Sequence, residues 1–271
     1  MTFERLPSGK RRATGATRDT VIFLDKLVIS VTRYWAALIA AVMLIFAGLP
    51  FVAPVAMRYG AAPVADVIYG LYGPPVCHQL AFRSWFLFGE QAAYPRALAG
   101  LPGPTFEDIA RADPSFNGLD VTTLNGNLNI AARAFRGNER VGWKVALCER
   151  DVAIYGSLSL FGFLFLGLAL FKAKVPYLPF WAYIVFGILP MLADGGSQLV
   201  TNLPFLGFNL NLVRESTPFL RVLTGAMFGV ANGWLAFPYL DDSMKETRKL
   251  VETKLIRAGV LKGSDEALEK A

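Results

Sequence analysis

The sequence predicts an all-α integral membrane protein with about four transmembrane helices, a re-entrant or interfacial helical hairpin and a small extramembrane insertion. Hydrophobic residues make up 54% of the 271 residues, charged residues make up 18%, and the mean hydropathy is +0.41. Several apolar runs approach the roughly 20 residues that a helix needs to cross a bilayer. The net charge of +6 comes from Lys and Arg residues that gather at the two chain ends. This distribution is typical of cytoplasmic flanks and argues against a nucleic-acid partner.

The N-terminal part of the chain divides into a polar tail and a first span. Residues 1–30 are basic and polar, so we expect a flexible cytoplasmic tail without a cleaved signal peptide. Residues 31–88 begin with an apolar run from about Tyr34 to Met57, which predicts the first transmembrane helix. Pro50 and Pro54 are expected to kink its outer half.

The segment 62–88 is apolar but interrupted. Gly73-Pro74-Pro75 breaks it into two short pieces, which favours two re-entrant or interfacial helices over one full span. The second piece is aromatic and is predicted as a helix over 80–88, with Cys77 and His78 at its N-terminus.

Composition changes again in the second half of the chain. Residues 89–147 are rich in Pro, Gly and Asn, which predicts a small extramembrane insertion, too short for a large core of its own. Residues 148–240 are expected to hold three transmembrane helices, at about Val152–Phe171, Phe180–Leu192 and Phe219–Leu240. Residues 241–271 are predicted as a basic amphipathic cytoplasmic tail.

Charge predicts the orientation of these spans. Both tails are basic, and Lys172 and Lys174 follow the second span directly. All three basic segments are therefore expected in the cytoplasm of a multi-pass cell-membrane protein. Four crossings satisfy this if 62–88 does not cross, and Cys77 and Cys148 then lie on the outer face.

The chain has one histidine and two cysteines, and the topology brings Cys77, His78 and Cys148 to one side. Two thiolates and an imidazole, completed by a carboxylate such as Asp151 or Asp194, would make a tetrahedral zinc-type metal site. A Cys77–Cys148 disulfide is the alternative, since an oxidising outer face allows one. Two unlinked thiols are the third interpretation, and the residues alone leave all three open.

Charged residues inside or beside apolar runs form a second group. They cost several kcal/mol in a membrane unless they pair or bind a ligand. Arg214 and Arg221 are seven residues apart and are expected on one helix face, where they could hold an anion, while Asp194 or His78 would handle protons. A set of structural salt bridges is the alternative. The ligand-binding candidates are Arg83, Arg150, Asp194, Gln198, Arg214 and Arg221.

Small residues repeat every four positions in the last span, at Gly225, Gly229 and Gly233. Such a stripe lets another helix approach closely. We expect it to pack inside the chain rather than at a dimer interface.

Several of these motifs resemble one family of membrane proteins. Cys77-His78-Gln79-x-x-x-Arg83-Ser84 and Cys148-x-Arg150 resemble the paired signatures of the domain-of-unknown-function 2085 family, over roughly Leu71–Trp234. Its later motifs are similar to Asp194-Gly195-x-x-Gln198, Arg214-x-Ser216 and Arg221-x-x-Thr224-Gly225. Two features depart from the family pattern: Ala153 stands where glycine is usual, and 89–147 is longer than expected. The resemblance implies a shared polar site and no assigned reaction.

Two functions follow as hypotheses. The first is an outer-face pocket that binds a metal or an anionic or lipid-linked ligand, with an enzymatic role undecided. The second is a non-enzymatic accessory or scaffold subunit that has a structural disulfide and a membrane-protein partner. A transporter is disfavoured because the four spans contain no detectable inverted repeat.

Overall fold

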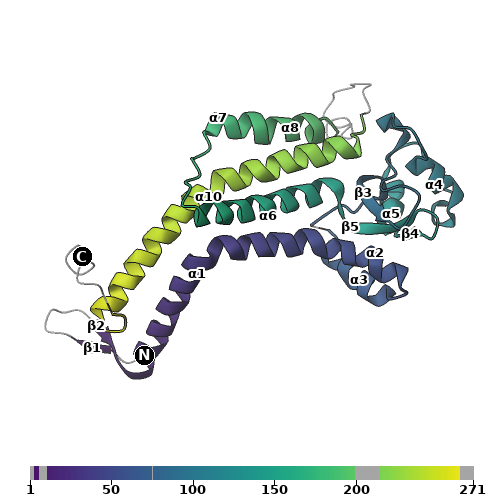
Figure 1. The fold of residues 1–271 in the computed structure, drawn as a ribbon. Coiled ribbons are helices and arrows are strands. Elements are labelled where there is room, and N and C mark those ends of the chain that lie inside the picture. Colours follow the sequence, from purple (N-terminus) through teal and green to yellow (C-terminus); the bar gives the residue numbers. More distant parts are fainter. Residues whose placement is uncertain (1–2, 6–10, 75, 199–213, 263–271) are drawn as a thin grey trace.

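The computed structural model describes residues 3–5, 11–74, 76–198 and 214–262 (Figure 1). Its long helices are α1 (Gly15–Gly48), α6 (Glu149–Leu170) and α10 (Pro218–Arg257). The helix α1 continues through a 3₁₀ turn at Leu49–Phe51 into α2 (Val52–Arg58). The other elements are α3 (Ala62–Leu71), α4 (Phe106–Ala112), α5 (Gly126–Ala134), α7 (Phe180–Tyr183), α8 (Leu189–Met191), β1 (Phe3–Arg5), β2 (Arg11–Ala13), β3 (Ser84–Leu87), β4 (Gly137–Asn138) and β5 (Gly142–Cys148).

Three helices among the described residues are long and apolar enough to cross a membrane: Gly15–Arg58, Glu149–Leu170 and Pro218–Arg257. A shorter apolar helix, Phe180–Gly196, contains α7, α8 and two π-helical turns, and it lies along α10 (Figure 1). The prediction of a mostly helical membrane protein is confirmed. The span predicted at Phe180–Leu192 corresponds to this shorter helix, which is not among the three long ones, and 202–213, predicted as a loop, lies outside the described residues.

Two helices extend well beyond the bundle. A 40-residue helix such as α10 is about 60 Å long, twice the thickness of a hydrocarbon core. The N-terminal part of α1 and the C-terminal part of α10 lie at the same end of the molecule (Figure 1). Asp25 of α1 accepts a hydrogen bond from Lys254 of α10 at 2.9 Å. The expectation of a flexible tail over 1–30 is wrong from Gly15 onward, because the helix that contains the first predicted span already begins at Gly15.

The glycine stripe of α10 packs against α6, as predicted. A Cβ atom on Gly229 would lie 2.3 Å from the Ile154 carbonyl oxygen, and one on Gly225 would lie 2.7 Å from the Arg150 carbonyl oxygen. A Cβ on Gly233 would meet the Phe161 ring at 2.8 Å. The two backbones are thus close enough that only glycine fits between them.

The opposite end of the bundle carries a small folded unit, residues 80–148, which we call the end domain (Figure 1). Its antiparallel sheet has the strand order β3-β5-β4. The predicted aromatic helix over 80–88 is wrong: this segment contains a 3₁₀ turn, Ala81–Arg83, and then β3. Burial alternates along β3, with Ser84 and Phe86 inside, so the period of two describes it better than a helical period.

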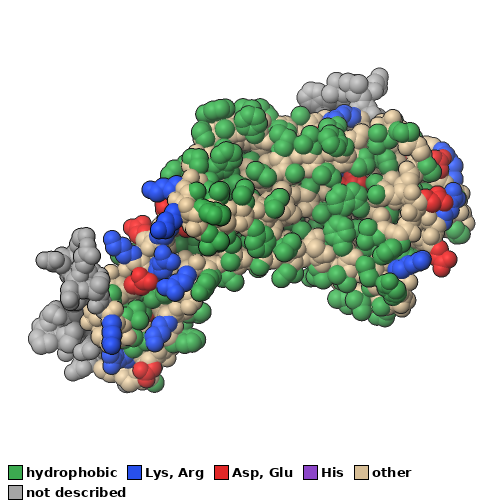
Figure 2. All heavy atoms as spheres, in the orientation of Figure 1, with side chains coloured by type: hydrophobic (Ala, Val, Ile, Leu, Met, Phe, Trp, Pro, Cys, Tyr) green, Lys and Arg blue, Asp and Glu red, His purple; other side chains and the backbone are tan. Residues whose placement is uncertain are grey.

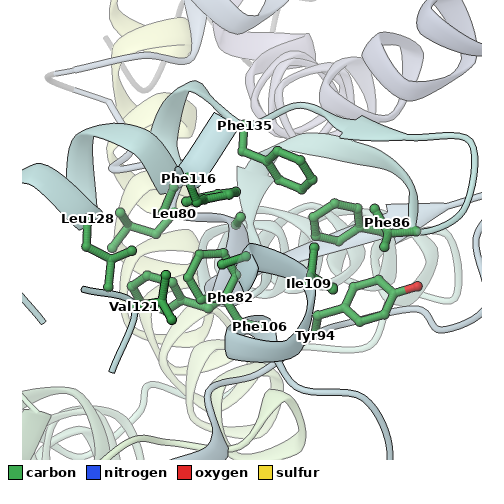
Figure 3. Close-up of a cluster of buried hydrophobic side chains, with 14 residues drawn as sticks. Leu80, Phe82, Phe86, Tyr94, Phe106, Ile109, Phe116, Val121, Leu128 and Phe135 are labelled. Carbon is green, nitrogen blue, oxygen red and sulfur yellow. The ribbon is translucent and has the colours of Figure 1, made fainter. Parts of the chain in front are cut away.

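The end domain has a compact aromatic core (Figure 3). Phe82 packs on Phe106, and Phe116 packs on Phe135, with ring centroids 5.1 and 5.3 Å apart. Phe82 precedes the predicted insertion boundary at 88–89, whereas the other three rings follow it. Segments from both sides therefore build one core, and this is how a short insertion obtains enough apolar surface to fold.

Candidate functional site

Cys77, His78 and Cys148 meet where the end domain joins the bundle. Cys148 ends β5 and is the residue before α6, while Cys77 and His78 lie in the extended segment that leads to β3. One ligand atom from each of the three residues lies within 4.8 Å of the others. Both cysteines are buried free thiols in this structure. The sheet creates this proximity, because Ser84 pairs with Cys148 across the β3–β5 ladder.

The Cys77 sulfur accepts two backbone hydrogen bonds. The donors are the N–H groups of Gln79 and Cys148, each at 3.4 Å. Gln79 makes this geometry possible because its φ is +50°, in the left-handed region that non-glycine residues rarely adopt. Its side-chain amide donates to the Tyr69 and Ala146 carbonyls at 2.9 and 2.8 Å, which holds the strained turn. Strain of this kind is concentrated at functional sites.

The two cysteines differ in their backbone setting. Cys77 was expected at a helix N-terminus, but the structure places Cys148 at such a position, before α6. The pKa of the Cys148 thiol is raised well above its usual value by its hydrogen bond with Cys77 and by burial, and Asp151 adds to the effect. Without a bound metal ion, Cys148 is therefore a protonated thiol.

His78 is a neutral imidazole. Burial lowers its pKa to about 3, and the positive charges of Arg83, Arg221, Arg150 and Arg133 contribute to the shift. Its Nδ1 atom accepts a hydrogen bond from the Leu80 N–H at 3.2 Å, so the ring proton is on Nε2. The neutral ring is the form that binds metals.

A cavity of about 310 Å³ opens beside these three residues. The structure brings seven of the nine predicted site residues to its wall, together with Asp151 and Val76: Cys77, His78, Arg83, Cys148, Arg150, Gln198 and Arg221. Asp194 and Arg214 are not part of the lining. The Nε atoms of Arg150 and Arg221 are buried and have no hydrogen-bond partner among the residues that the structure describes.

Arg221 is the centre of a buried ion-pair network. Its side chain is 2% exposed and contacts Glu149 at 3.1 Å and also Glu215, whose side chains are 1% and 3% exposed. Glu215 in turn holds Arg83 through two hydrogen bonds, at 3.1 and 3.2 Å. The Arg221 guanidinium also donates to the Phe82 carbonyl at 3.1 Å, which ties α10 to the end domain.

Asp194 is the centre of a second network. It accepts hydrogen bonds from Arg150 at 2.5 Å, from Arg214 at 3.1 Å and from Ser216 at 2.7 Å. Both carboxylate oxygens are thus engaged, which leaves Asp151 as the carboxylate that faces the cavity. The expectation that Arg214 and Arg221 share a helix face is wrong, because α10 begins at Pro218, after Arg214.

Glu149, Ser216 and Gln79 are site residues that the sequence did not single out as candidates. Glu149 is an acid in the first turn of an apolar helix, and it is almost fully buried. An acidic residue at such a position needs a cationic partner. Its place at the start of an apolar run is therefore the sequence feature that could have identified Glu149 as a site residue. Gln79 and Ser216 stood only in the motifs that resemble the family, and the role of Gln79 depends on a backbone angle that the sequence does not show.

Lys144 anchors the strained turn from inside the end domain. Its buried ammonium group donates to the carbonyls of Gln79 at 2.8 Å and Arg133 at 2.7 Å. Burial lowers the pKa of Lys144 to about 7.

This pKa gives a testable pH dependence. Between pH 7 and 10 the unfolded chain holds a proton on Lys144 that the folded chain lacks, so the free energy of unfolding should rise with pH. The slope of the free energy of unfolding is about 1.4 kcal/mol per pH unit in this range. Below pH 7 the slope from Lys144 falls to zero, because the group is protonated in both states. Thermal unfolding of the wild type and of Lys144→Met, compared at pH 7 and pH 9, measures it. Equal slopes in the two proteins would contradict the prediction.

The fold and the site define a helical membrane protein with a Cys–His–Cys cluster and an arginine-rich cavity at one end of the bundle. Residues 133–235 match the family model described as a predicted membrane protein, DUF2085. This match supports assignment of the chain to the family that its motifs resemble. It includes Cys148 and Arg221 but begins after Cys77 and His78. No curated protein and no solved structure matches the chain.

Proposed function

We propose that the protein binds a divalent metal ion of the zinc type at Cys77, His78 and Cys148. The observation that carries the proposal is the convergence of the three ligand atoms within 4.8 Å. Ligands bound tetrahedrally about 2.3 Å from a zinc ion are roughly 4 Å apart, so only small movements would close the site. Two sulfurs and one imidazole are a ligand set that suits zinc.

Charge balance is compatible with the same proposal. The two ion-pair networks contain four arginines but three carboxylates, which leaves one surplus positive charge. A zinc ion bound to two thiolates and the Asp151 carboxylate would carry one negative charge. The negative charge comes from Asp151, since Zn²⁺ with two thiolates is neutral, so a metal ion could bind to the two thiolates without unbalancing the site. Asp151 is the proposed fourth ligand or the neighbour of an open fourth position.

The arginine wall favours an anionic or lipid-linked ligand in the same cavity, on which the metal would act as a Lewis acid. The unpartnered Nε atoms of Arg150 and Arg221 are buried donors that an anion could satisfy. Arg83 and Gln198 complete this wall.

For the membrane, we propose four crossings with both termini in the cytoplasm and the metal site on the outer face. Lys172 and Lys174 follow the end of α6 that is far from the end domain, and the extended parts of α1 and α10 lie toward that same end (Figure 1). The helix Phe180–Gly196 would be the fourth crossing; it returns the chain from Lys174 to the end-domain side. Basic segments on a common side favour this orientation.

The metal proposal is tested by elemental analysis. Protein purified in detergent without chelator should contain close to one zinc per chain, and Cys77→Ser and His78→Ala should each lose it. Asp151→Asn should bind more weakly, because a fourth ligand or its neighbour is changed. Glu90→Gln, an exposed carboxylate that does not line the cavity, is the matched control and should retain the metal.

A scaffold with a structural disulfide is the competing function. Thiol labelling under denaturing conditions, with and without reductant, separates the two. Two reactive thiols after metal removal would support a metal site. Two thiols that react only after reduction, together with metal-free wild type, would instead establish the Cys77–Cys148 bridge and favour the scaffold.

A further inference from the structure

A second cleft lies at the far end of the bundle, away from the Cys–His–Cys cluster. It has a volume of about 490 Å³ and lies between the end of α6, the turn 171–179 and the middle of α10. Phe165, Ala169 and Pro238 give it an apolar floor, while Lys172, Lys174 and Lys245 provide cationic groups. This combination of an apolar floor and a basic mouth suits an amphiphilic anion.

The acidic residues of the cleft are already engaged. Asp241 pairs with Lys245 at 2.5 Å, and Asp242 accepts a hydrogen bond from the Tyr177 hydroxyl. Lys172 and Lys174 are exposed and make no side-chain hydrogen bond or ion pair among the described residues. The cleft therefore has three lysines and two aspartates, and the ammonium groups of Lys172 and Lys174 have no paired carboxylate among the described residues.

The backbone at Lys172 is an unusual feature. Its φ is +56°, and it occupies the position after α6 where glycine is the favoured residue. The Ala173 N–H closes the helix end on the Leu168 carbonyl at 3.0 Å. A lysine at this position costs stability that a glycine would not. Backbone strain of this kind suggests a functional role for the Lys172 side chain.

In the topology proposed above, the cleft at the end of α6 would lie at the depth of the lipid headgroups. Tyr177 lines the cleft and packs on Tyr239, and both rings are exposed, as in an interfacial aromatic belt. The Trp234 indole N–H donates to the Pro176 carbonyl at 2.9 Å, which fixes the turn against α10. Figure 2 shows that hydrophobic side chains give way to Lys and Arg side chains at this end of the bundle.

From these observations we propose that the cleft binds the phosphate group of an anionic phospholipid through Lys172 and Lys174. The glycerol and the first acyl carbons lie on Phe165, Ala169 and Pro238. Basic pockets between membrane helices are suited to such headgroups. The inference is independent of the metal site, which uses other residues at the opposite end of the bundle.

Native mass spectrometry of the full chain tests the proposal. The wild type, released from nanodiscs that contain equal amounts of phosphatidylglycerol and phosphatidylcholine, should retain phosphatidylglycerol. Lys172→Gln and Lys174→Gln should each reduce this retention about fivefold. Lys249→Gln, an exposed lysine on the same helix as Lys245, carries the same charge change and should have no effect.

Lys172→Gly separates a binding role from a structural one. This variant should unfold at a higher temperature, because the backbone strain is removed, and it should still lose phosphatidylglycerol selectivity. Retained selectivity in Lys172→Gly or in the Lys172→Gln/Lys174→Gln double variant would overturn the proposal. Displacement of the lipid by millimolar glycerol phosphate would assign the cleft to a soluble anion and would overturn it as well.

Discussion

Arg221→Met should lower the unfolding temperature of the detergent-purified protein by about 10 °C, which corresponds to a loss of about 4 kcal/mol. The substitution leaves the buried carboxylates of Glu149 and Glu215 without their shared guanidinium. Removing one partner of a buried ion pair costs much more than the pair itself contributes. Tryptophan fluorescence during heating measures the change, and size-exclusion chromatography measures the fraction that remains folded.

Two matched variants make the result specific. Arg214→Met removes an arginine whose side chain is 41% exposed, and Asp194 keeps Arg150 and Ser216, so the loss should be below about 1 kcal/mol. Adding Glu149→Gln and Glu215→Gln to Arg221→Met removes the uncompensated charges and should recover about half of the lost stability. If Arg221→Met is as stable as the wild type but fails to bind its anionic ligand, Arg221 is a ligand-binding group and the structural role fails.

Gly229→Ala should destabilise the protein by about 3 kcal/mol. The new methyl group would lie 2.1 Å from the Ser157 hydroxyl oxygen and 2.3 Å from the Ile154 carbonyl oxygen. The hydroxyl can rotate away, but the carbonyl belongs to the backbone of α6, so the two helices must separate. Thermal unfolding in detergent measures the loss.

Gly167→Ala is the control for this substitution. Gly167 is also in a membrane helix, but a Cβ there meets nothing within 4 Å, so stability should be unchanged or slightly higher. Comparable losses in the two variants would show that helix flexibility, rather than close packing of α6 on α10, explains the glycine at 229.

Local composition was sufficient to predict the helical bundle. The apolar runs and the glycine stripe depend on short-range patterns, and both correspond to helices or helix contacts in the structure. The end domain was harder, since its aromatic residues at 82, 85, 86 and 88 suit either a helix or a strand. Pairing with β5, about 60 residues later, decides between them, and no local pattern contains that information.

The sequence indicated which residues line the candidate site but not which ion pairs they form. Buried charge in an apolar context indicated Arg83, Arg150 and Arg221, and the cavity contains all three. Which carboxylate each arginine meets depends on how α6 and α10 are placed relative to each other. Arg214 is an example of a wrong placement: the prediction put it on a helix face with Arg221, but α10 begins four residues later, at Pro218.

The close contact between α6 and α10 also limits how the cavity can change. Gly225 and Gly229 fit against backbone carbonyls of α6, and Gly233 fits against the Phe161 ring, so sliding one helix along the other would bring bulkier α10 side chains against these atoms. A shift of one helical turn, about 5.4 Å, would carry Arg221 out of reach of Glu149, which is 3.1 Å away. The glycine stripe thus fixes the register between α6 and α10. The arginine wall of the cavity therefore depends on the register of α10 against α6, because Arg221 lies on one helix and its partner Glu149 on the other.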